Sequence, residues 1–126
     1  MTTRARGRPL QNAVSDDALL DAALLSFGEN GYDGASVREI ARRLAVSHNL
    51  IPQRFGSKER LWYAAVDHGF GRLRNDLTRE ALTLGSDELL ILRGLIRSFI
   101  EINAAHPSLL QVINQEASQP GPRLDY

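Results

Sequence analysis

Three serines, Ser36, Ser47 and Ser57, each precede an apolar helical pattern and divide the middle of the chain into short segments. A serine hydroxyl caps the free N–H groups at the start of a helix, so each serine predicts a helix N-terminus. Glu39 follows Ser36 by three residues, the spacing of a reciprocal capping box. The helix that Ser36 opens has room for about two turns. Two short helices joined by a tight turn are typical of a helix-turn-helix.

Longer helical patterns lie on both sides of this pair. The first runs from Ser15 to Gly31, where the glycine supplies a left-handed stop. A long amphipathic helix follows Ser57, and two further helices are predicted at about 86–104 and 108–117. Because no strand pattern and no internal repeat interrupt this order, the chain is predicted to be all-α.

Apolar side chains at helical spacing indicate which residues form the core. We expect Trp62, Phe70 and Phe99 to be core residues rather than walls of a ligand-binding cage. The helix at 86–104 carries a stripe of large apolar residues, which consists of Leu89, Leu92, Ile96, Phe99 and Ile100. Such a stripe has to be covered by another surface, so it predicts that the chain associates.

The composition excludes several classes of function. The chain has no cysteine, which rules out disulfides, thiolate nucleophiles and cysteine zinc sites. Its three histidines are scattered, and no set of nucleophile, base and oxyanion donors converges. We therefore expect no metal, no cofactor and no enzymatic activity. No stretch reaches the roughly 20 apolar residues that span a bilayer, and the basic start lacks a signal-peptide core, so we expect a cytoplasmic protein without a membrane partner.

Charge is balanced over the whole chain but not at its N-terminus. Fifteen basic and fifteen acidic side chains cancel, whereas Arg4, Arg6 and Arg8 have no acidic residue near them. The segment Arg6-Gly7-Arg8-Pro9 resembles the core of an AT-hook, in which two arginines lie along a narrow A·T minor groove. The three arginines are therefore predicted to contact the minor groove of DNA.

Across residues 16–66 the order of caps, breakers and apolar positions resembles the DNA-binding region of the TetR family of bacterial repressors. The matching segments are Leu20 to Phe27, Gly31-Tyr32, Ser36 to Ala41, Val46-Ser47 and Phe55 to Glu59. The resemblance implies a homodimer on double-stranded DNA, with the two third helices in successive major grooves. It also implies a flexible basic arm at 1–15, a helix-turn-helix DNA-binding domain at 16–56, and a partial helical domain at 57–126 that binds a small-molecule effector and dimerises.

In such a domain the third helix reads the bases. Asn and Gln can pair with adenine and cationic groups with guanine, which makes the predicted base-reading residues His48, Asn49, Gln53 and Arg54. Arg54 has a phosphate as its alternative target. Leu50 is divided between a thymine-methyl contact and the core, and Ile51 is expected in the core.

Helix starts offer free N–H groups to phosphates, so the predicted phosphate-binding residues are Ser36, Ser47, Ser57 and Lys58. By resemblance, Ser36 and Lys58 hold the DNA backbone on either side of the groove. Arg42 and Arg43 are expected to be solvated charges on the helix surface.

Three departures from the family pattern carry structural consequences. Ala45 stands in the turn where the family has glycine, so a residue that disfavours positive φ has to make the turn. Pro52 stands where the family has tyrosine, which predicts a kink or a tighter first turn in the third helix. Family members also extend well beyond the length of this chain, which is therefore expected to be truncated.

These patterns predict a sequence-specific DNA-binding regulator, a repressor that a small-molecule effector releases. The alternative is a truncated helical interaction module with weak or no specific DNA binding, which Pro52 and the early end at Tyr126 favour.

Overall fold

The computed structural model describes residues 14–119 and 121–126, and these residues form helices without any strand. In chain order the elements are α2 (Asp16–Gly34), α3 (Val37–Arg43), α4 (Leu50–Phe55), α5 (Lys58–Thr83), α6 (Glu88–Ala105), α7 (Ser108–Ser118) and the 3-10 helix η1 (Pro122–Asp125). The predicted all-α fold is confirmed. Among these helices, none is long and apolar enough to cross a membrane. The predicted minor-groove residues Arg4, Arg6 and Arg8 lie outside the described residues.

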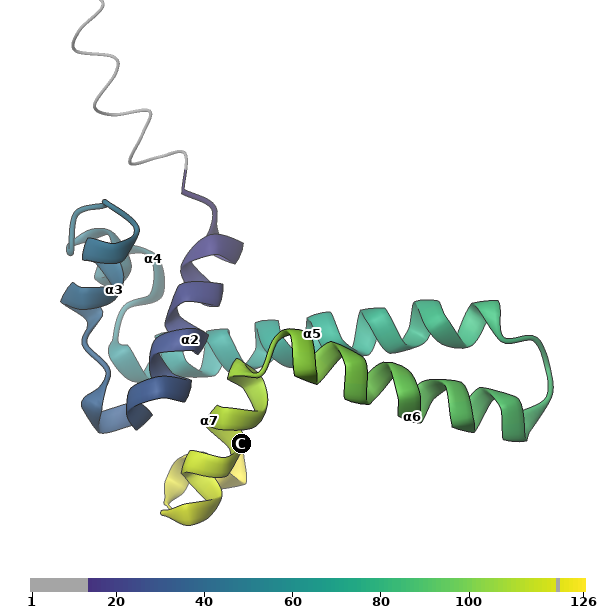
Figure 1. Cartoon of the computed structure of the whole chain (residues 1–126). Helices are drawn as coiled ribbons and strands as arrows, with labels where there is room; N and C mark the ends of the chain where they lie inside the picture. The colour runs from purple at the N-terminus through teal and green to yellow at the C-terminus, as the bar shows by residue number, and fades with distance from the viewer. Residues whose placement is uncertain (1–13, 120) are drawn as a thin grey trace, which may run out of the picture.

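The helices form a compact group and a projecting hairpin (Figure 1). α2, α3 and α4 gather around the first part of α5, and α7 packs against both α2 and α5. The rest of α5 extends away from this group, and α6 returns alongside it. The predicted DNA-binding helices therefore lie at the opposite end of the molecule from the tip of the hairpin.

α2 provides the centre of the hydrophobic core. Leu19, Ala23 and Phe27 of α2 are at most 1% exposed. They belong to one cluster with buried residues of every neighbouring helix, among them Ile40 of α3, Ile51 of α4, Leu61 and Ala65 of α5, and Leu109 and Val112 of α7. Burial of each large apolar side chain stabilises the fold by about 1.5–3 kcal/mol, so this shared cluster holds α2 to α3, α4, α5 and α7 together.

Most of the predicted helix ends are confirmed. The Oγ atoms of Ser15, Ser36 and Ser57 accept backbone N–H groups three residues later at 3.1, 3.3 and 3.2 Å. Gly31 interrupts α2 with φ 73° and ψ 173°, and a single further turn carries the chain to Gly34. The helix at 86–104 begins slightly later than expected, because Asp87 rather than Ser86 caps α6 by accepting the N–H groups of Leu89 and Leu90.

The prediction that Phe70 and Phe99 are core residues is wrong, whereas Trp62 is buried as expected. Phe70 is 48% exposed and Phe99 is 40% exposed. The physical reasons differ: Phe70 lines an open cavity between α5, α7 and η1, whereas Phe99 lies on α6, which packs mainly against α5 alone. The predicted stripe on α6 is also exposed, from 40% at Phe99 to 78% at Leu89. Nothing within the described residues covers it.

Ala45 makes the turn between α3 and α4 with a left-handed backbone, as the sequence predicted. Its φ is 55°, and it is the only residue other than glycine with a positive φ in the described part of the chain. The N–H of Val46 donates to the carbonyl of Ala41, and the N–H of Ala45 donates to that of Arg42, at 3.0 and 3.1 Å. This pair of bonds is the Schellman arrangement that usually places glycine at the position of Ala45.

Because the left-handed conformation costs an L-residue about 1–2 kcal/mol, we expect Ala45→Gly to stabilise the protein. Glycine loses more backbone freedom on folding than alanine does, which offsets part of this gain. The expected net stabilisation is about 0.5–1 kcal/mol. Gly85, with φ 76° and no atom near its missing Cβ, supplies a control of opposite sign, since Gly85→Ala should destabilise by a similar amount. Thermal unfolding monitored by circular dichroism measures both. A lower Tm for Ala45→Gly would contradict the account.

Candidate nucleic-acid interface

α4 has one side in the core and one in solvent. Ile51 is 1% exposed and belongs to the core cluster, as predicted. His48, Asn49 and Gln53 are exposed, and within the described residues no other side chain hydrogen-bonds to theirs. A short helix that is anchored by one buried residue presents its remaining side chains at fixed positions.

The start of α4 differs from the prediction. Ser47 was expected to cap this helix, but the helix begins at Leu50 and the capping position is Asn49, whose side chain makes no capping bond. Ser47 instead closes a tight turn: its Oγ accepts the N–H of Asn49 at 3.3 Å, and its carbonyl accepts the N–H of Leu50 at 3.0 Å. The predicted tighter first turn is therefore confirmed, and the Asn49 side chain is left free of a capping role.

Pro52 fits this geometry without loss of a helical hydrogen bond. It is the third residue of α4, and the first N–H groups of a helix have no partner inside the helix. A proline there removes a donor that the helix does not use. The N–H of Gln53 already donates to the carbonyl of Asn49 at 3.1 Å, so the regular pattern starts directly after Pro52.

Arg54, one of the predicted base-reading residues, is held by the start of α2. Its guanidinium donates to the carbonyl of Val14 at 2.7 Å and to Asp16 Oδ1 at 3.1 Å. The side chain is 24% exposed. These contacts link the end of α4 to the start of α2 and engage the Arg54 guanidinium, whereas the side chains of His48, Asn49 and Gln53 are exposed.

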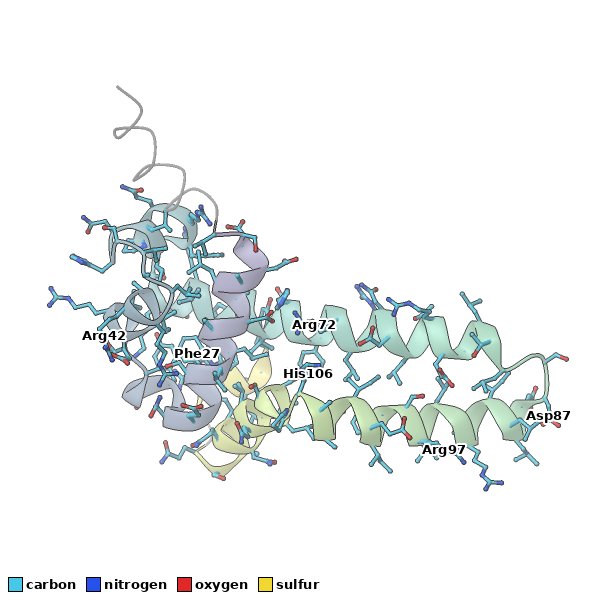
Figure 2. All side chains as sticks on the ribbon, turned by 45° about the horizontal axis from the view of Figure 1, so that its top comes forward. Phe27, Arg42, Arg72, Asp87, Arg97 and His106 are labelled. Atoms are coloured by element: carbon cyan, nitrogen blue, oxygen red, sulfur yellow. The ribbon has the colours of Figure 1, made fainter. Side chains whose placement is uncertain are left out.

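The arginines of α3 are balanced by carboxylates. Arg42 forms two hydrogen bonds to Glu39, at 2.9 and 2.6 Å, and its side chain is 76% exposed. Figure 2 shows Arg42 at the outer side of the helices that form the compact group. The hydrogen bond from Arg42 lowers the pKa of the Glu39 carboxyl. Because Glu39 pairs with Arg42 and Arg43, it does not complete the reciprocal capping box with Ser36 that the sequence predicted.

Lys58 lies at the start of α5, next to the end of α2. Its Nζ is 4.7 Å from the ring centroid of Tyr32 and 3.5 Å from the carbonyl oxygen of Asp33. Asp33 stands three residues before Ser36, the cap of α3. These contacts bring the capped starts of α3 and α5, with Ser36 and Ser57, into the same region of the domain.

A polar cluster that was not predicted from the sequence joins α2 to α5. Asp21 hydrogen-bonds to Arg72 at 2.7 and 2.9 Å and to His68 at 2.8 Å. Burial acts to raise the pKa of Asp21, but the hydrogen bonds from Arg72 and His68 outweigh it, and the pKa is lowered. Figure 2 shows Arg72 at the point where α5 passes α2. The only local signal is the spacing of His68 and Arg72 on one face of α5.

α3 and α4 are two short helices joined by a tight turn, α2 packs behind them, and α4 has an exposed polar face. This arrangement defines a helix-turn-helix DNA-binding domain. Residues 19–65 match the model of the family described as bacterial regulatory proteins, tetR family. These residues belong to the TetR family.

Curated relatives agree with this assignment. The transcriptional repressor Rv3405c of Mycobacterium tuberculosis is 38% identical over 85 residues, which are 64% of this chain and 45% of the relative. The repressor NicS of Pseudomonas putida is 26% identical over 122 residues, 96% of this chain and 57% of the relative. The activator FasR of Mycolicibacterium smegmatis is 32% identical over 96 residues, 76% of this chain and 43% of the relative. The chain spans about half the length of these relatives, whose names describe transcription regulators rather than enzymes.

The polar cluster between α2 and α5 predicts a specific pH dependence of stability. A carboxyl with a lowered folded pKa stabilises the protein above its unfolded value of about 3.9, and this contribution is lost as the pH falls through the folded pKa. Asp21→Asn should therefore lower the midpoint of urea unfolding at neutral pH. The difference from the unmodified chain should shrink below about pH 4. Glu101→Gln, on the exposed face of α6, is the control; a difference that is independent of pH would contradict the role of Asp21.

Proposed function

We propose that this chain is a sequence-specific DNA-binding transcriptional regulator in which α4 reads the major groove. The observation that carries the proposal is the exposed polar group of His48 and Asn49, directly before α4, and Gln53 on α4, a helix whose opposite side is fixed in the core by Ile51. Asn and Gln side chains form bidentate hydrogen bonds with adenine, and His donates to guanine or to a phosphate.

Arg54 has a different role in this proposal. Since its guanidinium is already engaged by Val14 and Asp16, we assign it to holding α4 against α2 rather than to base reading. Ser36, Ser47, Ser57 and Lys58 are proposed to contact phosphates, which set the orientation of α4 on the duplex without reading sequence. Arg4, Arg6 and Arg8 are proposed to add contacts in the minor groove.

The regulator is proposed to act as a homodimer in the bacterial cytoplasm. A dimer places two copies of α4 in successive major grooves, so each half of a palindromic operator meets the same side chains. The exposed apolar stripe of α6, with Leu92 and Ile96 at its centre, supports association because such a surface is stabilised by removal from water. We also propose that residues 16–56 form a DNA-binding domain and that residues 57–126 form a regulatory domain.

We further propose that the regulator is a repressor and that a small-molecule effector releases it from DNA. Two of the three relatives described above are named repressors and one is named an activator, so the names of most of these relatives support repression. The packing of α7 and α5 against α2 offers a mechanical path, since a ligand that shifts either helix also shifts the helix behind α4.

The base-reading assignment predicts a change of specificity rather than of general affinity. Asn49→Ala and Gln53→Ala should each relax the preference at one or two base pairs, at a cost of about 1–3 kcal/mol against the correct site. The measurement is the affinity for the preferred duplex relative to duplexes that differ from it at single base pairs. Unchanged preferences in both variants would remove these residues as readers.

The phosphate assignment predicts the opposite behaviour for Lys58. Lys58→Ala should weaken binding to all duplexes alike and reduce the slope of log K against log salt by about one unit. Fluorescence anisotropy of a labelled duplex at several salt concentrations measures the slope. Arg93→Ala, which removes an exposed cation from α6, is the matched control and should leave the slope unchanged. A loss confined to one DNA sequence would contradict the role of Lys58.

The exposed stripe of α6 also favours a second candidate, a helical interaction module with weak or no specific DNA binding. The two candidates separate in the same salt titration, because a DNA-binding regulator loses affinity steeply as salt rises. Association of the chain in sedimentation without any salt-dependent binding to duplex DNA would favour the interaction module.

A further inference from the structure

A cavity of about 310 Å³ lies between α5, α7 and η1. Its apolar walls include the rings of Trp62, Phe70 and Tyr126 and the aliphatic side chains of Val112 and Ile113. This volume is at the small end of the range of about 300–1,000 Å³ that ligand sites occupy. Aromatic walls of this kind favour a flat apolar body and attract a cation to the faces of the rings.

One polar group in the wall of this cavity is incompletely satisfied. Glu116 of α7 is 6% exposed, and its Oε1 accepts a hydrogen bond from Arg123 Nε at 3.0 Å. Its Oε2 is buried and has no hydrogen-bond partner among the described residues. A buried carboxylate oxygen without a donor costs free energy, which a ligand that brings an N–H group to it would recover.

The charges around the cavity favour a cation over an anion. Glu116 and Asp67 contribute two carboxylates to the lining, and Arg123 is its single cation. The guanidinium of Arg123 is already engaged, since it contacts Glu116 and lies 3.9 Å from the ring centroid of Tyr32. An anionic ligand would therefore meet two carboxylates and an occupied arginine, and a neutral apolar ligand would leave Oε2 without a donor.

We propose that this cavity binds a small organic amine, whose protonated nitrogen donates to Glu116 Oε2 while its flat apolar body packs against Trp62, Phe70 and Tyr126. The carboxylate has to turn toward the cavity for this contact, because Oε2 is covered by its surroundings. The terminal torsion of a glutamate side chain is broad, so the intrinsic cost of this rotation is small. The rotation also shifts Oε1 relative to Arg123 Nε, to which it is hydrogen-bonded at 3.0 Å.

The position of the cavity connects the ligand to the DNA-binding helices. Arg123 joins Glu116 of α7 to Tyr32 near the end of α2, and Lys58 at the start of α5 packs on the same ring. A ligand that changes the orientation of Glu116 thus changes the contacts of Arg123 at the end of α2. Assignment of the amine as the effector rests on the proposed function, whereas binding of the amine does not.

Trp62 is the only tryptophan of the chain and lines the cavity, so its fluorescence reports occupancy directly. The experiment titrates the full chain, without DNA, with 2-phenylethylamine at neutral pH, and in parallel with 2-phenylethanol, its neutral analogue. We expect a saturable fluorescence change with the amine and at least about tenfold weaker binding of the alcohol, the loss typical of one charge-assisted hydrogen bond. Equal binding of the two compounds, or no saturable change with the amine, would overturn the proposal.

Glu116→Gln should reduce the affinity for the amine by about tenfold or more and bring it close to that for the alcohol. Asp125→Asn removes an exposed carboxylate from η1 that does not line the cavity, and it should bind the amine like the unmodified chain. Retained affinity in a folded Glu116→Gln variant would refute the assigned contact. If that variant does not fold, as circular dichroism would reveal, the comparison of amine with alcohol on the unmodified chain decides.

The effector role has its own test. Addition of saturating amine to the complex with duplex DNA should lower the affinity for DNA in the unmodified chain. Binding of the amine with no change in DNA affinity would refute the effector role and leave the DNA-binding function standing. A chain that binds the amine but no DNA would instead refute the proposed function alone.

Discussion

Burial of one face of α2 is the constraint on which the rest of the structure depends. Leu19, Ala23 and Phe27 are almost completely buried, and they contribute to one cluster with α3, α4, α5 and α7. The two short helices have too few residues to be stable alone, because helices below about 12–15 residues are marginal in water. α3 and α4 therefore depend on the surface that α2 and the start of α5 provide.

Contacts of α2 also connect the proposed DNA-reading helix with the proposed amine cavity. At its N-terminal end α2 is held to α4 through Arg54, in its middle to α5 through Asp21 and Arg72, and near its C-terminal end to η1 through Tyr32 and Arg123. Each link joins α2 to a different element, and each includes an arginine side chain that is not part of the apolar core. A change in α5, α7 or η1 can therefore reach the helix behind α4 without disruption of the core itself.

Local chemistry explains which features the sequence predicted. The caps at Ser36 and Ser57, the stop at Gly31 and the left-handed turn at Ala45 depend on residues within a few positions, so they could be recognised from the sequence. Features that depend on distant partners could not be recognised from the sequence. The partners of Arg54 lie about forty residues earlier in the chain. The exposure of Phe70 and Phe99 depends on which faces of α5 and α6 the other helices leave uncovered. Helical periodicity identifies an apolar face, but it does not identify the surface that covers it.

The central claim is that α4 presents a fixed set of side chains to the major groove of DNA. The most direct measurement is selection of bound duplexes from a random library at near-physiological salt, followed by sequencing. The account predicts enrichment of paired half-sites about one helical turn, roughly 34–36 Å, apart. A bound pool with the same sequence distribution as the starting library would contradict the claim that this helix reads sequence.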